Sequence, residues 1–142
     1  MLEKGILLED INILLEWNKP LKQLAIENNA AIIEQADRTS VEWGKHTILN
    51  GLELNLSNTY LLSKPEKFNF IECDFNGDKE SFNYFYIIEK HLEKHFGKPL
   101  ESEDDLEIKR HKSRVWQISN VRIRLYLFEM HAFRLNFRIE KT

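Results

Sequence analysis

Two runs of alternating residues near the C-terminal end place the strongest constraint on the fold. In residues 121–127 and 133–139 every odd position is apolar, and the even positions are polar or aromatic. Successive side chains of a strand point to opposite faces, so each run predicts a strand with one apolar face. The short segment 129–132 between them predicts an antiparallel hairpin. Because both apolar sets are odd-numbered, they share one face only if the connecting loop contains an odd number of residues.

The even positions of this hairpin form the most coherent candidate binding surface. They are Arg122, Arg124, Tyr126, Arg134 and Arg138, together with Phe128 and Asn136. Guanidinium and aromatic groups in combination suit phosphates, bases or a carboxylate-rich protein surface, and both groups are enriched at interfaces. The alternative is that these arginines are solvated, or are covered by a helix and paired with its acidic residues Glu80, Glu89 and Glu93.

The charge is divided unequally along the 142 residues. Residues 1–107 contain 11 Lys and Arg and 21 Asp and Glu, a net charge of −10, whereas residues 108–142 contain 9 and 2, a net charge of +7. Such asymmetry indicates either a basic segment for an anionic partner or two segments that neutralise each other within one fold. The second interpretation is slightly favoured, because the basic segment is rich in core-type apolar residues.

The segment 79–96 predicts the longest helix. Its apolar residues recur at spacings of three and four and form one stripe, which consists of Phe85, Ile88, Leu92 and Phe96. Asp78, after the turn signal Asn76-Gly77, is expected to be the N-cap. Gly97 is expected to be a left-handed C-cap, and Pro99 prevents the helix from continuing.

A strongly acidic loop is predicted after this helix, over residues 101–107. Its candidate binding residues are Glu101, Glu103, Asp104 and Asp105. Charge runs are usually solvated loops. A dense carboxylate patch is also suited to cover a basic site on a partner, with fast and salt-sensitive association.

The remaining elements are shorter. We expect a strand from Ile11 to Trp17, a helix from Pro20 to about Asn29, and a strand around Val41 and Trp43. Residues 48–56 predict a further strand, with Leu52, Leu54 and Leu56 on one face. A break at 63–67 precedes a central strand at 68–75, and 115–118 predict the strand before the hairpin.

Together these elements predict a single α+β domain over residues 1–142, with a mainly antiparallel sheet of about six or seven strands and two helices packed on it. The order of strand, helix and strands recurs in residues 11–60 and 66–140. In each segment a tryptophan, Trp43 or Trp116, precedes an alternating aliphatic strand. This order is compatible with internal duplication.

Motifs for catalysis or metal binding are weak. His91 and His95 lie four residues apart and share one side of the predicted helix, His95 nearer the apolar stripe, which makes them weak metal-ligand candidates. Leu92 and Lys94 stand where the zinc-protease patterns require glutamate, so surface histidines are the favoured interpretation. Cys73 lies among apolar neighbours and is expected to be a core thiol. We therefore expect no cofactor and no enzymatic activity.

The expected location is the cytoplasm. A single cysteine cannot form an internal disulfide, and charged residues interrupt the first twenty positions too often for a signal peptide or a membrane span.

In chain length, cytosolic character and lack of catalytic motifs, the chain resembles the small immunity proteins that bacteria make against their own polymorphic toxins. The residues that carry the resemblance are His95-Phe96-Gly97-Lys98-Pro99, the acidic segment after them, Trp116 and the alternating strands. The resemblance implies a non-catalytic protein that binds a toxin domain and occludes its active site or an exosite.

Two alternatives stay open at this stage. The first is an RNA- or nucleic-acid-binding module that uses the Arg and aromatic face, although no RNP-type sequence is present and the pI is near 6.0. The second is a metal-dependent enzyme built on His91 and His95. The sequence leaves the partner unidentified and a homodimer open, and it predicts no membrane association.

Overall fold

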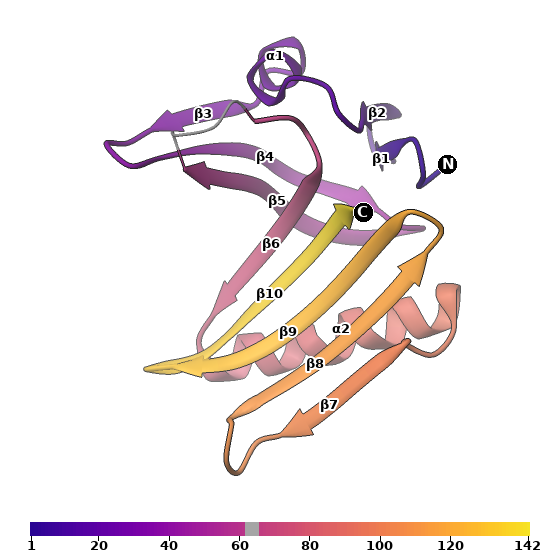
Figure 1. The fold of residues 1–142 in the computed structure, drawn as a ribbon, viewed down its shortest axis with the longest axis vertical. Helices are drawn as coiled ribbons and strands as arrows, with labels where there is room; N and C mark the ends of the chain where they lie inside the picture. The colour runs from indigo at the N-terminus through magenta and orange to yellow at the C-terminus, as the bar shows by residue number, and fades with distance from the viewer. Residues whose placement is uncertain (62–65) are drawn as a thin grey trace. The chain divides into compact units, whose positions relative to one another are not determined.

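The computed structural model describes residues 1–61 and 66–142 (Figure 1). The chain consists of two compact units. Unit 1 comprises Met1–Glu72 with Lys141, and unit 2 comprises Cys73–Glu140 with Thr142. The described residues form two helices and ten strands, and the paired strands are antiparallel. The predicted α+β class with a mainly antiparallel sheet is therefore confirmed. Most of the predicted break at 63–67 lies outside the described residues.

Unit 1 begins with a hairpin of β1 (Gly5–Leu8) and β2 (Ile13–Glu16), followed by α1 (Leu21–Glu27). The strand expected from Ile11 starts two residues later, and β1 was not predicted, because four residues are too few to show a periodic pattern. A Cβ on Gly5 would lie 2.1 Å from the carbonyl oxygen of Leu15, so this close pairing requires glycine. The helix α1 confirms the predicted helix with somewhat shorter bounds, and it buries Leu21, Leu24 and Ala25.

The sheet of unit 1 has the order β3-β4-β5-β6. Its strands are β3 (Ala31–Glu34), β4 (Arg38–Ile48), β5 (Leu52–Leu61) and the first residues of β6 (Phe70–Asn76). The predicted strand at 48–56 is divided by a turn at 49–51, where Asn50 and Gly51 have positive φ. Leu52, Leu54 and Leu56 are buried on one face of β5, as the alternation predicted.

A bulge in β4 changes which of its residues are buried. Pairing with β5 shifts between Glu42 and Gly44, so that Trp43 is an extra residue. Val41 and the bulged residue Trp43, both at odd positions, are buried. After the bulge the buried residue is Ile48, which is at an even position. A single alternation pattern therefore does not describe this strand.

Polar side chains fix the core of unit 1 beside this bulge. Nε1 of Trp43 donates a 2.7 Å hydrogen bond to Oδ1 of Asn58, and Nδ2 of Asn58 donates to the carbonyl oxygen of Phe70. Asn58 is fully buried, so both bonds satisfy groups that water does not reach. The ring of Phe68 stacks on Trp17 at 5.1 Å between centroids and meets Trp43 edge-on.

Unit 2 contains the rest of β6, α2 (Asp78–Phe96), β7 (Glu101–Asp105), β8 (His111–Ile118), β9 (Val121–Met130) and β10 (Ala132–Lys141). Its strand order is β6-β10-β9-β8-β7. The predicted hairpin is present, and His131, with φ of 68°, is the single residue between β9 and β10, which satisfies the odd loop length. The odd positions of both strands are buried: Val121, Ile123, Leu125, Leu127, Phe133, Leu135, Phe137 and Ile139.

The helix α2 runs across one face of the sheet of unit 2 (Figure 1). It buries Ser81, Phe85, Ile88 and Leu92 against the apolar face of the strands, in agreement with the predicted stripe. Phe96, the last residue of that stripe, is half-buried. Nε1 of Trp116 donates a 2.9 Å hydrogen bond to the carbonyl oxygen of Gly97 and ties the end of the helix to β8.

Three local predictions in unit 2 are wrong. The acidic segment is not a loop, because Glu101–Asp105 forms the strand β7 and pairs with β8. Asp78 is the first helical residue rather than the N-cap, and its Oδ1 accepts a 2.7 Å hydrogen bond from the backbone N–H of Phe133. Gly97 has a positive φ of 82°, but its ψ of −166° is not left-handed helical.

The two units repeat the same order of elements. In unit 1, β2 is followed by α1 and then by the antiparallel strands β3, β4 and β5. In unit 2, β6 is followed by α2 and then by the antiparallel strands β7, β8 and β9. The sequence segments 11–60 and 66–140 thus contain matching series of strand, helix and three strands. Internal duplication itself stays a prediction.

Candidate functional site

The face of the unit 2 sheet that is opposite α2 carries most of the predicted binding residues. We call it the outer face and define it by the odd positions of β7 and β8 and the even positions of β9 and β10. Alternation along the strands and the cross-strand register place eight of the nine predicted residues on it, namely Arg122, Arg124, Tyr126, Arg134, Arg138, Glu101, Glu103 and Asp105. The exception is Asp104, which lies on the α2 side.

The arginines of the outer face differ in how they are neutralised. Nη2 of Arg122 lies 4.0 Å from Oε2 of Glu101, and Nε of Arg138 lies 3.2 Å from Oε2 of Glu140. Arg124 and Arg134 have no carboxylate within 4.0 Å in the described part of the chain. Two cations of this face are therefore available to a partner.

The alternative in which α2 covers these arginines is not what the structure shows. The helix lies on the apolar face, and its acidic residue Glu89 binds Arg114 of β8 instead. The contacts of Arg122, Arg124 and Arg134 do not include Glu80, Glu89 or Glu93 in residues 1–61 and 66–142.

Aromatic rings lie next to these cations. Tyr126 and Phe128 stack along β9 with ring centroids 5.1 Å apart, and the ring of His111 on β8 lies 5.8 Å from that of Tyr126. Neighbouring Arg and Tyr side chains of this kind form the centre of many protein interfaces.

An open depression of about 270 Å³ lies on the β7, β8 and β9 part of the outer face. Ser113 and Val115 of the middle strand form its floor, because their side chains are short. The longer side chains around them are Glu101, Glu103, His111, Arg122, Arg124 and Tyr126. The depression therefore has an acidic side on β7 and a basic and aromatic side on β9.

The acidic residues of β7 are largely engaged within unit 2. Oε1 of Glu103 lies 3.1 Å from Nζ of Lys109 and 3.0 Å from Nε2 of His111, and these two groups, Lys109 first, hold the pKa of Glu103 below its ordinary value. The backbone N–H of Ile108 donates to Asp105 and lowers its pKa in the same way. The predicted acidic surface is thus mostly compensated.

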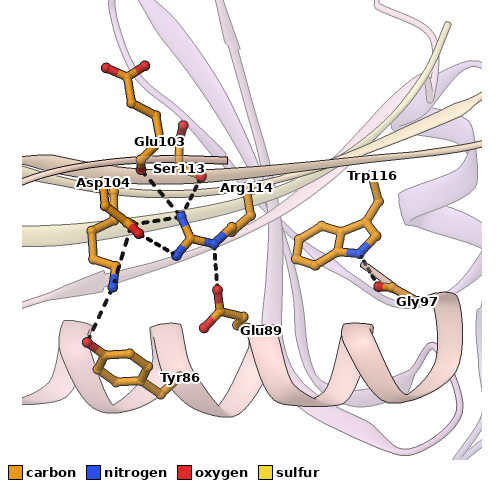
Figure 2. A network of polar contacts seen from close by, with 9 residues as sticks. Tyr86, Glu89, Gly97, Glu103, Asp104, Ser113, Arg114 and Trp116 are labelled. Atoms are coloured by element: carbon orange, nitrogen blue, oxygen red, sulfur yellow. Dashed lines mark hydrogen bonds and ion pairs between the residues drawn. The ribbon is translucent and has the colours of Figure 1, made fainter. Parts of the chain in front are cut away.

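The buried side chain of Arg114 is the centre of an ion network on the α2 side (Figure 2). Its Nε donates to Oε2 of Glu89 at 2.5 Å, and Nη1 and Nη2 donate to the two carboxylate oxygens of Asp104 at 2.8 and 3.2 Å. Nη1 also reaches the carbonyl oxygens of Ser113 and Glu103. Burial opposes the charge of Arg114, yet these carboxylates raise its pKa.

Lys112 extends the network along β8. Its Nζ lies 3.6 Å from Oδ1 of Asp104 and 5.1 and 4.9 Å from the ring centroids of Phe85 and Tyr86. The network is internally satisfied, and its cations are buried, so it stabilises the contact between α2 and the sheet and is not a docking surface.

Within residues 1–61 and 66–142, the weak metal candidates do not acquire a third ligand. The rings of His91 and His95 lie 4.5 Å apart, and His95 is exposed while His91 is half-buried, the reverse of the order predicted from the helical wheel. In the described parts of the chain, no three His, Cys, Asp or Glu side chains come close enough to hold a metal ion. Cys73 is buried, as predicted.

The sequence did not assign Arg114, His111 or Ser113 to a binding surface, although His111 was considered as a further metal ligand for His91 and His95. Arg114 was visible only as a member of the basic segment, and Ser113 carried no signal of its own. Their roles depend on pairing of β8 with both β7 and β9, which brings together residues up to 17 positions apart in the register.

No protein-family model, curated protein sequence or solved structure matches this chain. Neither helix in the described residues combines the length and the apolar character that a membrane crossing requires.

Proposed function

We propose that this chain is a non-catalytic protein-binding domain and that the outer face of unit 2 binds the partner. The observation that carries the proposal is the uncompensated charge of Arg124 and Arg134 beside the stacked rings of Tyr126 and Phe128. Stiff aromatic rings lose little entropy on binding, and arginine supplies several donors in a fixed geometry. A partner with a carboxylate-rich surface is complementary to this arrangement.

The distribution of acidic residues favours a protein over a nucleic acid. Glu101, Glu103 and Asp105 share the outer face with the arginines, and Asp74 lies at its β6 side, where its Oδ1 accepts a 2.8 Å hydrogen bond from Asn136. A phosphate backbone requires a continuous positive track. Alternating cations and anions suit the mixed charges of a protein surface.

In the setting suggested by the resemblance to immunity proteins, the partner is a toxin domain and the complex forms in the cytoplasm. Complementary charges would then give fast and salt-sensitive association. The acidic strand contributes less to this proposal than the sequence predicted, because Lys109, His111 and Arg114 already engage it.

The test is site-specific photo-crosslinking in the source cell. A photoreactive amino acid replaces Arg124 on the outer face or, as the control, Lys94, an exposed residue of α2 on the other side of the sheet. We expect a discrete protein adduct from position 124 and none from position 94. A nuclease-sensitive adduct would support the nucleic-acid alternative, and equal labelling from both positions would contradict a specific face.

Charge reversal then tests the face quantitatively with the purified partner. Arg124→Glu combined with Arg134→Glu is expected to weaken binding by at least about ten-fold, because each change replaces attraction with repulsion. The matched control is Lys94→Glu combined with Lys98→Glu, which changes the net charge equally at exposed positions away from the outer face. Equal effects of the two pairs would show that only net charge matters.

A further inference from the structure

The depression on the outer face has an asymmetric charge balance. On its acidic side, Glu103 contacts both Lys109 and His111. On its basic side, Arg124 is exposed without a carboxylate neighbour in the described residues, and Arg122 reaches Glu101 only at 4.0 Å. Nε of Arg122 is buried and has no acceptor among residues 1–61 and 66–142. The uncompensated groups of the depression are therefore guanidinium hydrogen-bond donors, and an anion is the complementary ligand.

The register of the strands brings these donors together over a small floor. Val115 lies directly opposite Arg124 and Glu101, and Ser113 lies directly opposite Tyr126 and Glu103. Side chains at directly paired positions have Cβ atoms only about 5 Å apart. The hydroxyl of Ser113 and the guanidinium of Arg124 thus border the same small space, with the ring of Tyr126 beside them.

We infer that this depression binds a single carboxylate side chain of the protein partner, an aspartate or glutamate. The inference rests on the proposed function and names the chemistry of its central contact. The planar guanidinium of Arg124 matches a carboxylate through two parallel hydrogen bonds, and the Ser113 hydroxyl supplies a third donor. The flat side of Tyr126 packs against the apolar part of the residue that carries the carboxylate.

The acidic side of the depression selects against more highly charged anions. The depression offers the uncompensated charge of Arg124, with Glu101 and Glu103 across the floor, so it can neutralise the single charge of a carboxylate but not both charges of a phosphate dianion.

The test uses small probes and the full chain. Acetyl-Asp-Phe-amide is titrated into isotopically labelled protein at about 50 mM salt, where screening is moderate, and the backbone amide signals of Ser113, Val115 and Arg124 are followed by NMR. The comparison probes are acetyl-Asn-Phe-amide, which has the same shape without the charge, and inorganic phosphate. We expect saturable shifts at these three amides with the aspartyl probe only.

Three variants locate the site. Arg124→Gln removes the main donor at an exposed position, and Ser113→Leu fills the floor without a change in charge. Both are expected to weaken binding of the aspartyl probe by about ten-fold, the effect of losing a charge-assisted contact. Lys94→Gln is the control, because it removes one positive charge at an exposed position of α2, on the other side of the sheet, and its effect should be within about two-fold.

The outcomes separate this inference from the proposed function. Equal shifts with phosphate or with the asparaginyl probe, or equal losses with Arg124→Gln and Lys94→Gln, would overturn the carboxylate site. If a protein crosslinks to position 124 but the aspartyl probe does not bind, the inference fails while the proposed function stands. If the probe binds as expected but crosslinking captures only RNA, the site stands and the proposed function fails.

Discussion

Arg114 and Arg124 lie on neighbouring strands of one sheet but on opposite faces, and their surroundings differ sharply. Arg114 is only 7% exposed and forms hydrogen bonds with two carboxylates and two carbonyl oxygens. Arg124 is exposed and has no carboxylate partner in the described residues. The same residue type thus stabilises the unit on one face and is available for binding on the other. The predictions below test this contrast by its effect on stability.

The largest expected effect is the loss of Arg114. Arg114→Ala leaves the mostly buried carboxylate of Glu89 without its cation and also removes the partner of Asp104, and we expect the free energy of unfolding to fall by roughly 3–5 kcal/mol. Urea unfolding, with hydrogen exchange of β8 and β9 amides to report on unit 2, measures the loss. Arg124→Ala is the control and should change stability by no more than about 0.5 kcal/mol. Equal losses would contradict the contrast.

Double-mutant cycles extend the comparison from single arginines to one ion pair on each face. Arg114→Met and Glu89→Gln, singly and together, should show a coupling of about 1–3 kcal/mol, because the two charges lie in a mostly buried contact. The corresponding cycle on the outer face uses Arg122→Gln and Glu101→Gln. Its coupling should not exceed about 0.5 kcal/mol, since this pair is separated by 4.0 Å and is largely exposed.

A smaller effect is expected at Lys112. Lys112→Met keeps the apolar stem but removes the ammonium group from its positions above the rings of Phe85 and Tyr86. We expect a loss of about 1 kcal/mol in the free energy of unfolding. Lys109→Met, which changes an exposed lysine on the turn before β8, should leave the urea midpoint unchanged. Because Lys112 also lies 3.6 Å from Asp104, an equal or greater loss at Lys109 would contradict a larger contribution of the contacts of Lys112.

The smallest expected effect is on how the free energy of unfolding changes at acidic pH. The hydrogen bond from Arg114, followed by the charges of Arg114 and Lys112, holds the pKa of Asp104 below its ordinary value of 3.8. A carboxyl group whose folded pKa is lowered stabilises the protein above its unfolded pKa, and this stability is lost as the pH falls through the folded pKa. Below about pH 4, Asp104→Asn should therefore lose less stability per pH unit than the wild type. Parallel curves would contradict this assignment.

Much of the fold follows from periodicity in the sequence. The hairpin of β9 and β10, its buried odd positions and the odd loop length were predicted because alternation depends only on the local geometry of a strand. The apolar stripe of α2 was predicted for the same reason, with the period of a helix. These features need no knowledge of the partner elements.

The predictions were wrong where contacts with distant segments of the same chain decide the local structure. Residues 101–105 are acidic and show no apolar alternation, yet they form β7 because β8 offers hydrogen bonds along its edge. Asp78 was expected to cap its own helix, but the N–H of Phe133, 55 positions away, competes for its carboxylate. The bulge at Trp43 changes the buried positions of β4 from odd to even numbers, and no local pattern in the sequence predicted it.

For the candidate site, the sequence by itself determined the set of residues that share a face, since alternation along a strand fixes this without reference to any other element. Only the tertiary structure decided which charges are neutralised. Arg114 meets Glu89, 25 positions earlier, because α2 packs on that side of β8. Arg124 meets no carboxylate in the described residues because it points to the other side. Electrostatic neutralisation depends on distances of a few ångströms between segments far apart in the chain, and periodicity contains no information about such distances.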